Sequence, residues 1–223
     1  MKQYSFLAFD LGATSGRTIL GTLNEGKLQM KELTRFPNQI LELGGHFYWN
    51  IYSLYDHLKA GMVAAAKEDV EIESIGIDTW GVDFAFLGSD GQMLGMPYAY
   101  RDPHTMGAPE EYFEKIMSRK EVYEATGIQV MNFNSLYQLY AMKRDKSSLL
   151  AAAKEALFIP DALSYMLTGK KVVEYTIAST SQMLNPRTKK FEKELLEKMG
   201  VDPELFGQIV MPGYVIGELT DTL

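Results

Sequence analysis

The residues with the clearest chemical potential lie near the N-terminus, between two apolar runs. The first run ends on Asp10, and Arg17 opens the second after a turn that contains Gly12 and Gly16. Glycine permits positive φ or close backbone approach, so the amides of residues 13–15 can turn inward as an anion-binding nest. A carboxylate can hold hydrated magnesium, and a guanidinium matches phosphate oxygens. The stretch therefore predicts a site for a nucleotide phosphate bound with a metal ion.

This turn differs from the common phosphate-binding loops. No Gly-Lys-Thr/Ser follows Gly16, and the turn leads into a strand, whereas P-loop and dinucleotide-binding fingerprints lead into a helix. The simpler alternative is a tight hairpin in which Asp10 caps its own turn and Arg17 is solvated. The continuation Thr14-Ser15-Gly16-Arg17 favours the phosphate interpretation.

Composition narrows the class of protein. The chain has 223 residues, a net charge of −7 and no cysteine, and its sequence pI is near 5.1. An acidic chain without a basic stripe is a poor ligand for nucleic acid, and no disulfide or thiolate metal site can form. The sequence also has no apolar stretch of ~18 residues. We therefore expect a soluble, cytoplasmic protein that binds neither nucleic acid nor a membrane.

Apolar spacing predicts a sheet that begins with a three-stranded meander. A turn at residues 24–26 and the alternation of residues 27–31 indicate a third antiparallel strand that runs toward Phe36. Helical spacing then extends from a cap at Asn50 to Ala66. Residues 74–78 indicate a buried strand, which we expect to lie beside the first.

The second half of the chain has a largely helical pattern. Residues 107–144 keep a helical period with a break at residues 126–127 and a restart at residues 134–135, which indicates an inserted helical layer. A further helix is expected to end at Gly169, where glycine can form the C-terminal cap. One large domain is the expected organisation for this length.

Four blocks in order resemble the FGGY carbohydrate kinases, and most closely the rhamnulokinase group of that family. They are FDLGATSGR at residues 9–17, IGIDTWGVDF at 75–84, PYAYRD at 97–102 and NSLYQL at 134–139. The resemblance implies an α/β, ribonuclease-H-like fold of the actin-like ATPase and sugar kinase type, with a mixed sheet led by three antiparallel strands and helices on both faces. It also implies that residues 1–223 are the N-terminal domain. The C-terminal domain, with the general-base Asp and the adenosine site, is expected beyond Leu223.

The same resemblance assigns roles to individual residues. It implies that Asp10 organises Mg²⁺, that Arg17 neutralises the transferring charge, and that Gly81 contacts the sugar through its backbone. Amides and hydroxyls for the phosphates of ATP are expected from Ala13, Thr14, Ser15 and Gly16, together with Arg17. A side chain at position 81 would fill the space that the sugar needs.

Several residues near Gly81 leave alternatives open. Trp80 could stack on the apolar face of a 6-deoxy sugar, or it could plug the end of the sheet as a core residue. Asp83 and Asp78 are candidate acceptors for sugar hydroxyls or second carboxylates near Asp10. Alternatively, Asp78 bonds to its own turn, and Asp83 pairs with an arginine such as Arg101.

The remaining polar candidates favour structural roles. Arg101 and Asp102 are as readily a structural pair as a pocket wall. His46, His57 and His104 are scattered in the sequence without metal-ligand spacing, so we expect them at surface or satisfied positions.

The resemblance implies an ATP-dependent kinase that phosphorylates a primary hydroxyl of a deoxyketose, with L-rhamnulose favoured. L-Fuculose, L-xylulose or another ketose is the alternative substrate, and a non-catalytic sugar-responsive module is the alternative function. Asp10 and Arg17 favour catalysis, because a sugar sensor has no need of a phosphate clamp. Without the C-terminal domain, its base and its closure over the site, we expect this chain to fold but not to phosphorylate sugar.

Overall fold

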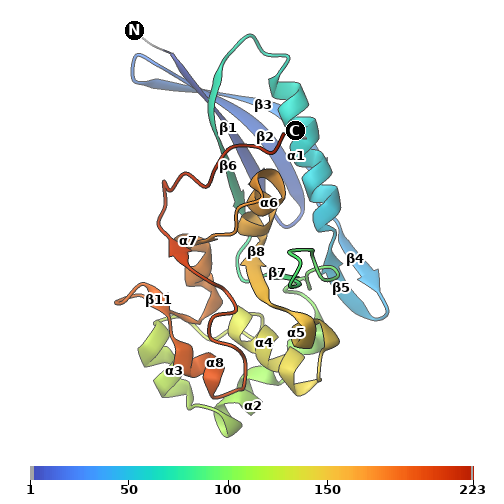
Figure 1. Cartoon of the computed structure of the whole chain (residues 1–223), viewed down its shortest axis with the longest axis vertical. Helices are drawn as coiled ribbons and strands as arrows, with labels where there is room; N and C mark the ends of the chain where they lie inside the picture. Colours follow the sequence, from blue (N-terminus) through green and yellow to red (C-terminus); the bar gives the residue numbers. More distant parts are fainter. Residues whose placement is uncertain (1–2, 222) are drawn as a thin grey trace.

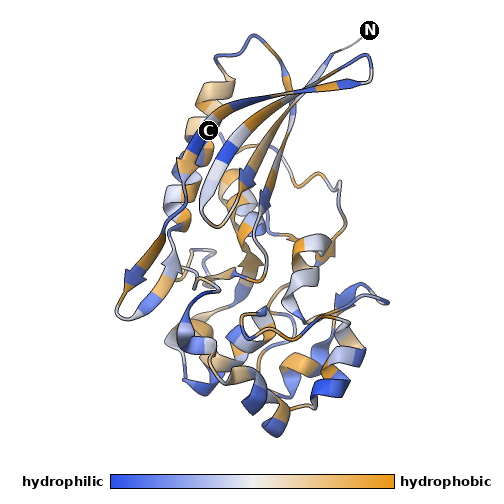
Figure 2. Cartoon of the chain, turned by 180° about the vertical axis from the view of Figure 1, so that it is seen from behind, coloured by the Kyte–Doolittle hydropathy of each residue, from blue (hydrophilic) through white to orange (hydrophobic). Residues whose placement is uncertain are grey.

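The structure is a computed structural model that describes residues 3–221 and residue 223. Figure 1 shows an elongated molecule with a long-stranded sheet at one end and most of the helices at the other. A single hydrophobic core cluster extends through both ends. In Figure 2 the hydropathy changes from residue to residue along the strands and around the helices, as expected where each element buries one side.

The sheet has the predicted topology. Its order is β3-β2-β1-β6, with an antiparallel meander and a parallel β1–β6 pair. The strands are β1 (Tyr4–Leu11), β2 (Ser15–Asn24), β3 (Lys27–Pro37) and β6 (Ile72–Thr79). The β2–β3 turn places Glu25 and Gly26 at φ of 52° and 74°, which is the conformation that two-residue hairpin turns favour.

Two helices pack on the same face of this sheet. The predicted helix α1 (Ile51–Ala65) begins at Asn50, whose side chain accepts a hydrogen bond from the Ser53 amide at 3.1 Å. Gly61 of α1 lies directly against Thr18 and Phe9. The helix α6 (Ile159–Thr168) contacts both β6 and α1, and it ends at Gly169 as predicted, with φ of 68°.

The opposite face of the sheet is left open by the described part of the chain. Phe6, Leu28 and Met30 are exposed there, and Ser74, Gly76 and Asp78 of β6 are exposed as well. Both helices therefore lie on one face, where helices on both faces were expected. The strand predicted at residues 74–78 is present as part of β6 and pairs with β1. Its expected burial was wrong for the same reason, because only alternate residues of β6 point toward α6.

The predicted helical layer lies between β7 (Phe84–Leu87) and β8 (Glu155–Phe158), which pair with each other. Within the predicted residues 107–144 it contains α2 (Ala108–Lys115), α3 (Arg119–Thr126) and α4 (Ser135–Arg144), and it is flanked by η1 (Pro103–Thr105) and α5 (Ser148–Ala152), which were not predicted. The predicted break is confirmed, since α3 ends at Gly127 with φ of 68°. A capping box of Ser118 and Glu121 starts α3, and α4 starts after Asn134.

Short elements complete the structure. The hairpin of β4 (Ile40–Leu43) and β5 (His46–Trp49) projects beside α1 (Figure 1). The others are β9 (Val173–Glu174), which pairs with β12 (Ile209–Val210), α7 (Tyr175–Ala178), η2 (Ser179–Ser181), the pair β10 (Leu184–Asn185) and β11 (Lys190–Phe191), and α8 (Lys193–Glu197). Among the described residues, no helix has the length and apolar character needed to cross a membrane.

Replacing Gly61 with alanine should destabilise the chain, although alanine normally favours a helix. A Cβ at this position would lie 2.2 Å from Thr18 Oγ1 and 2.7 Å from the Phe9 ring. We expect α1 to be pushed from the sheet at a cost of about 1–3 kcal/mol in the free energy of unfolding. Urea unfolding measures this cost, with Val63→Ala on the exposed side of α1 as the control. A Gly61→Ala chain as stable as the control would contradict the close packing.

Candidate active site

The Asp10–Arg17 pair lies next to the turn of the β1–β2 hairpin. The two residues are paired in register across the strands, and Arg17 Nε lies 3.1 Å from Asp10 Oδ2. Both side chains remain accessible, with exposed fractions of 45% for Asp10 and 36% for Arg17. The pair therefore presents one carboxylate and one guanidinium to solvent at the end of the sheet.

In the turn between these two residues, the carbonyls of Gly12, Thr14 and Ser15 accept hydrogen bonds and two amides are free. The Gly12 amide donates to Ser15 O at 2.9 Å, and the Asn38 amide donates to Thr14 O at 3.0 Å. The Asn38 side chain also donates to Gly12 O at 2.9 Å. No hydrogen bond in the described part of the chain uses the amide of Ala13 or of Thr14. Such free successive amides can receive an anion.

Sequence reasoning missed Asn38, which is buried and far from the turn in sequence. Gly12 and Gly16 both have negative φ, so here the glycines serve close approach rather than a left-handed backbone. A Cβ on Gly16 would lie 2.3 Å from the Phe36 ring, and one on Gly12 would lie 3.1 Å from Ser15 O.

A second carboxylate lies beside Asp10. In the parallel β1–β6 pair, Asp10 is the register partner of Asp78, and the Asp78 side chain is exposed. No hydrogen bond in the described part of the chain joins the Asp78 carboxylate to its own turn, where the Thr79 hydroxyl donates to Trp80 O at 2.8 Å. No group of three or more His, Cys, Asp or Glu that could bind a metal occurs among the described residues. Two neighbouring carboxylates nevertheless fit Mg²⁺, which commonly takes one or two carboxylates and completes its shell with phosphate and water.

Trp80 and Asp83 form part of one buried polar cluster. Asp83 Oδ2 accepts hydrogen bonds from Trp49 Nε1 at 2.6 Å, Trp80 Nε1 at 2.9 Å and the Tyr100 amide at 3.0 Å. Asp83 Oδ1 accepts from Gln138 Nε2 at 2.9 Å. The Trp49 and Trp80 rings lie 4.0 Å apart between centroids.

Asp83 itself is 0% exposed, so its carboxylate has no free side for a sugar in this conformation. Burial raises the pKa of Asp83 to about 7, while hydrogen bonds from Trp49, Gln138, the Tyr100 amide and Trp80 oppose the shift. The suggested pairing with Arg101 was wrong, because the Arg101 guanidinium lies over the Tyr100 ring instead.

Gly81 lies directly against Thr180 of η2. A Cβ on Gly81 would lie 2.9 Å from the Cβ, Cγ2 and Oγ1 atoms of Thr180. Chain packing therefore already requires glycine here, and the space on this side of Gly81 belongs to Thr180 rather than to a sugar. The half-buried Trp80 precedes Gly81 and leaves part of its ring accessible.

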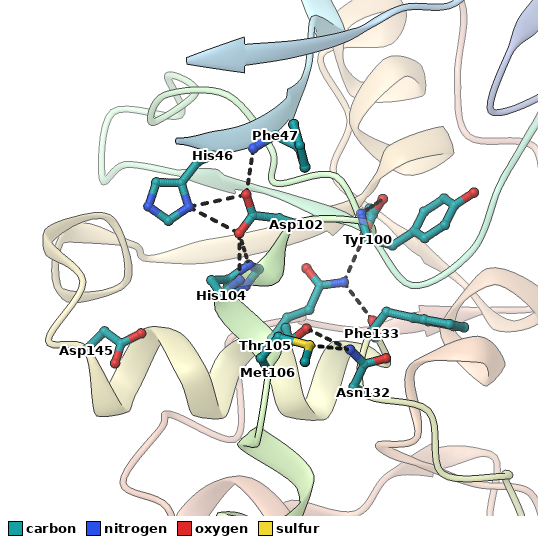
Figure 3. A network of polar contacts seen from close by, with 12 residues as sticks. His46, Phe47, Tyr100, Asp102, His104, Thr105, Met106, Asn132, Phe133 and Asp145 are labelled. Atoms are coloured by element: carbon teal, nitrogen blue, oxygen red, sulfur yellow. Dashed lines mark hydrogen bonds and ion pairs between the residues drawn. The ribbon is translucent and has the colours of Figure 1, made fainter. Parts of the chain in front are cut away.

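Tertiary structure brings two of the scattered histidines together on Asp102 (Figure 3). Asp102 accepts hydrogen bonds from the Phe47 amide at 2.6 Å, His104 Nδ1 at 2.7 Å and His46 Nδ1 at 3.1 Å. Burial disfavours the Asp102 charge, but these donors and the His104 amide hold its pKa below the usual value. Burial lowers the pKa of His104. Asp102 therefore anchors β5 and η1 and does not pair with Arg101.

His57 occupies a separate place, stacked on the Phe36 ring at 3.9 Å between centroids. The histidines were expected at surface or satisfied positions. The contacts of His46 and His57 agree with this expectation, whereas His104 Nε2 is buried without a hydrogen-bond partner.

The two candidate segments leave the same edge of the sheet. Leu11 at the end of β1 is the register partner of Thr79 at the end of β6. The turn with the free amides follows Leu11, and Trp80 and Gly81 follow Thr79. A phosphate-sized anion and a polar ligand at Gly81 would thus approach one edge, with Asp10 and Asp78 between them.

Comparisons with known proteins identify the family and the fold of the chain. Residues 5–223 match the model of the FGGY family of carbohydrate kinases, N-terminal domain. The chain is 60% identical over 221 residues to a rhamnulokinase of Bacteroides thetaiotaomicron and 43% identical over 213 residues to one of Halalkalibacterium halodurans. These alignments cover 99% and 96% of this chain but 45% of each relative. The chain thus spans less than half the length of these curated relatives.

Solved structures show the same fold at low sequence identity. A gluconate kinase from Lactobacillus acidophilus aligns with a TM-score of 0.88 and 21% identity, over 99% of this chain and 44% of that chain. A ligand-bound xylulose kinase from the same organism aligns with a TM-score of 0.87 and 20% identity, over 98% and 44%. With the family model matched over almost the whole sequence, the chain belongs to the FGGY family of carbohydrate kinases, as an N-terminal domain of that family.

Proposed function

We propose that this chain is the N-terminal half of an ATP-dependent carbohydrate kinase that phosphorylates a deoxyketose, L-rhamnulose in the first place, at a primary hydroxyl. The observation that carries the proposal is the shared sheet edge, where the turn with two free amides and the Trp80–Gly81 segment start beside each other. The similarity to rhamnulokinases supports the choice of sugar.

The β1–β2 turn would bind the phosphates of ATP. The amides of Ala13 and Thr14 are free to donate, and the Thr14 and Ser15 hydroxyls lie in the same turn, which closes at Gly16. The Arg17 guanidinium offers charge-assisted hydrogen bonds to phosphate oxygens. In phosphoryl transfer the protein itself does little covalent chemistry. Most of the catalysis comes from positioning the reacting groups and neutralising the charge on the phosphates.

Asp10 and Asp78 would hold magnesium beside these phosphates. When bound, the metal ion neutralises charge on the β- and γ-phosphates. The two carboxylates start side by side, because Asp10 and Asp78 are register partners one residue before the ends of β1 and β6.

The sugar would lie at Gly81 and Trp80, and the buried Asp83 would hold Trp80 in place. Trp80 offers an aromatic face to the apolar side of a deoxyketose. The indole is oriented by the hydrogen bond that Trp80 Nε1 donates to Asp83 Oδ2 at 2.9 Å. The base that removes the hydroxyl proton would come from a C-terminal domain like the one that completes the longer relatives. We place the reaction in the cytoplasm, which suits a chain without cysteine.

Loss of the Arg17 guanidinium should weaken nucleotide binding by this chain. Calorimetry with magnesium and ATP should show Arg17→Ala binding about tenfold more weakly or worse, because a hydrogen bond to a charged group is lost. Arg35→Ala is the matched control, because Arg35 faces Arg17 across the strands but pairs with Glu32. An equal loss in both variants would mean that only net charge matters.

Asp10→Asn should abolish most catalysis in the longer protein that includes the C-terminal half. We expect kcat to fall at least ~100-fold with a nearly unchanged KM for the ketose, since charge stabilisation is lost while the sugar contacts remain. A panel of L-rhamnulose, L-fuculose and L-xylulose measured in the same assay identifies the substrate. Asp56→Asn, on the exposed side of α1, serves as the control. A kcat within about threefold of the wild type would remove Asp10 from the metal site.

The free energy of unfolding should depend on pH through the titration of Asp83. The pKa of Asp83 is near 7 in the folded state and about 4 in the unfolded state. Asp83 therefore stays protonated to higher pH when the chain is folded. The contribution of Asp83 to stability is thus complete below about pH 4 and falls by up to about 1.4 kcal/mol per pH unit as the pH rises toward 7. Urea unfolding across this range should show the fall in the wild type relative to Asp83→Asn. Parallel pH profiles for the two chains would show that Asp83 does not titrate there.

A further inference from the structure

Val82 adopts a backbone conformation that its side chain disfavours. Its φ is 66°, a region that β-branched residues almost never occupy. The Asp83 amide donates to Gly81 O at 2.9 Å, which closes a three-residue γ-turn centred on Val82. With positive φ at the centre, this is the rare and strained form of that turn. Such strain persists only where the surroundings enforce it, and it concentrates at functional sites.

Two distant segments enforce this turn. Thr180 Oγ1 of η2 accepts a hydrogen bond from the Val82 amide at 3.0 Å and donates one to Ile177 O at 2.7 Å. The Ser135 hydroxyl of α4 donates to Val82 O at 2.5 Å. Thr180 also packs against the Cα of Gly81, where it fills the place of a side chain. Thr180 therefore both accepts a hydrogen bond from the Val82 amide and packs where a side chain of residue 81 would lie.

The γ-turn leaves one backbone polar group of Gly81 free to bind a ligand. The Gly81 carbonyl is taken by the Asp83 amide, whereas no hydrogen bond in the described part of the chain uses the Gly81 amide. The half-buried Trp80 next to it is held by Asp83. A ligand at this edge therefore meets a free N–H donor and an oriented indole, and both depend on the direction of the 80–82 backbone.

We propose that Thr180 is a positioning residue for the sugar-binding end of the site. Through its hydroxyl and its contact with Gly81 it holds the γ-turn at Val82, so that the Gly81 amide points to a hydroxyl oxygen of the ketose beside the Trp80 ring. This inference rests on the proposed function, since it concerns how the same site binds its sugar.

The two tryptophans make the site observable in this chain. The sequence has only Trp49 and Trp80, and both indoles donate to Asp83. Their emission therefore reports on ligands at this end, and titration with L-rhamnulose, supported by calorimetry, gives a dissociation constant. ATP binding to the same samples is the internal control, because no hydrogen bond in the described part of the chain joins Thr180 to the β1–β2 turn.

Thr180→Val keeps the shape of the side chain and removes the hydroxyl. We expect it to weaken L-rhamnulose binding about tenfold, with ATP binding unchanged, because the turn loses the group that fixes the Val82 amide. Thr180→Ser retains the hydroxyl and should restore sugar affinity to within about threefold of the wild type. Thr176→Val, one turn earlier and exposed, should bind the sugar like the wild type.

The outcomes separate this inference from the proposed function. No response of the wild-type chain to the ketose would overturn the proposed function at its sugar site. A wild-type response that Thr180→Val retains in full would overturn the positioning role alone, as would equal losses in Thr180→Val and Thr180→Ser. If Thr180→Val does not fold, Thr180→Ala must show the same selective loss of sugar affinity, and normal sugar binding by that variant would equally overturn the role.

Discussion

The structure depends on one buried carboxylate. Asp83 is fully enclosed and accepts hydrogen bonds from Trp49, Trp80, the Tyr100 amide and Gln138. A buried acid without such partners would cost several kcal/mol, so these partners must meet at one place. They come from the end of β5, the segment after β6, the loop before η1 and the helix α4. The sheet and the helical layer are joined through this cluster.

The candidate chemistry lies where the sheet meets that cluster. Asp10, Arg17 and Asp78 lie at the ends of strands whose other residues are fixed by the hydrogen bonds of the sheet, so their side chains start from a rigid frame. The free amides of Ala13 and Thr14 belong to the turn, which Asn38 holds by its carbonyls. A rigid scaffold that carries reactive groups on its loops is a common solution in enzymes. Here the strained turn at Val82 is the corresponding feature on the side that we propose for sugar binding.

Sequence reasoning succeeded where the cause was local. The hairpin at Gly12, the cap at Asn50, the glycine ends at Gly127 and Gly169 and the restart at Asn134 all depend on neighbouring residues, and all agree with the structure. The sheet order was also predicted, because a meander followed by a helix and a strand has few alternative arrangements. The candidate site was predicted as a set of residues, of which Asp10, Arg17 and the turn between them occupy one exposed place.

By itself, the sequence determined the elements, the family and the residue types at the sheet edge, since spacing, caps and motifs are written in consecutive residues. Only the tertiary structure decided what those residues contact. Asp83 is buried among four hydrogen-bond donors, Gly81 lies against Thr180, Asn38 holds the β1–β2 turn, and His46 and His104 both bind Asp102. The open face of the sheet likewise became visible only when α1 and α6 were both placed on the other side. Each of these contacts joins segments far apart in the chain, and long-range packing leaves no signal in the spacing of neighbouring residues.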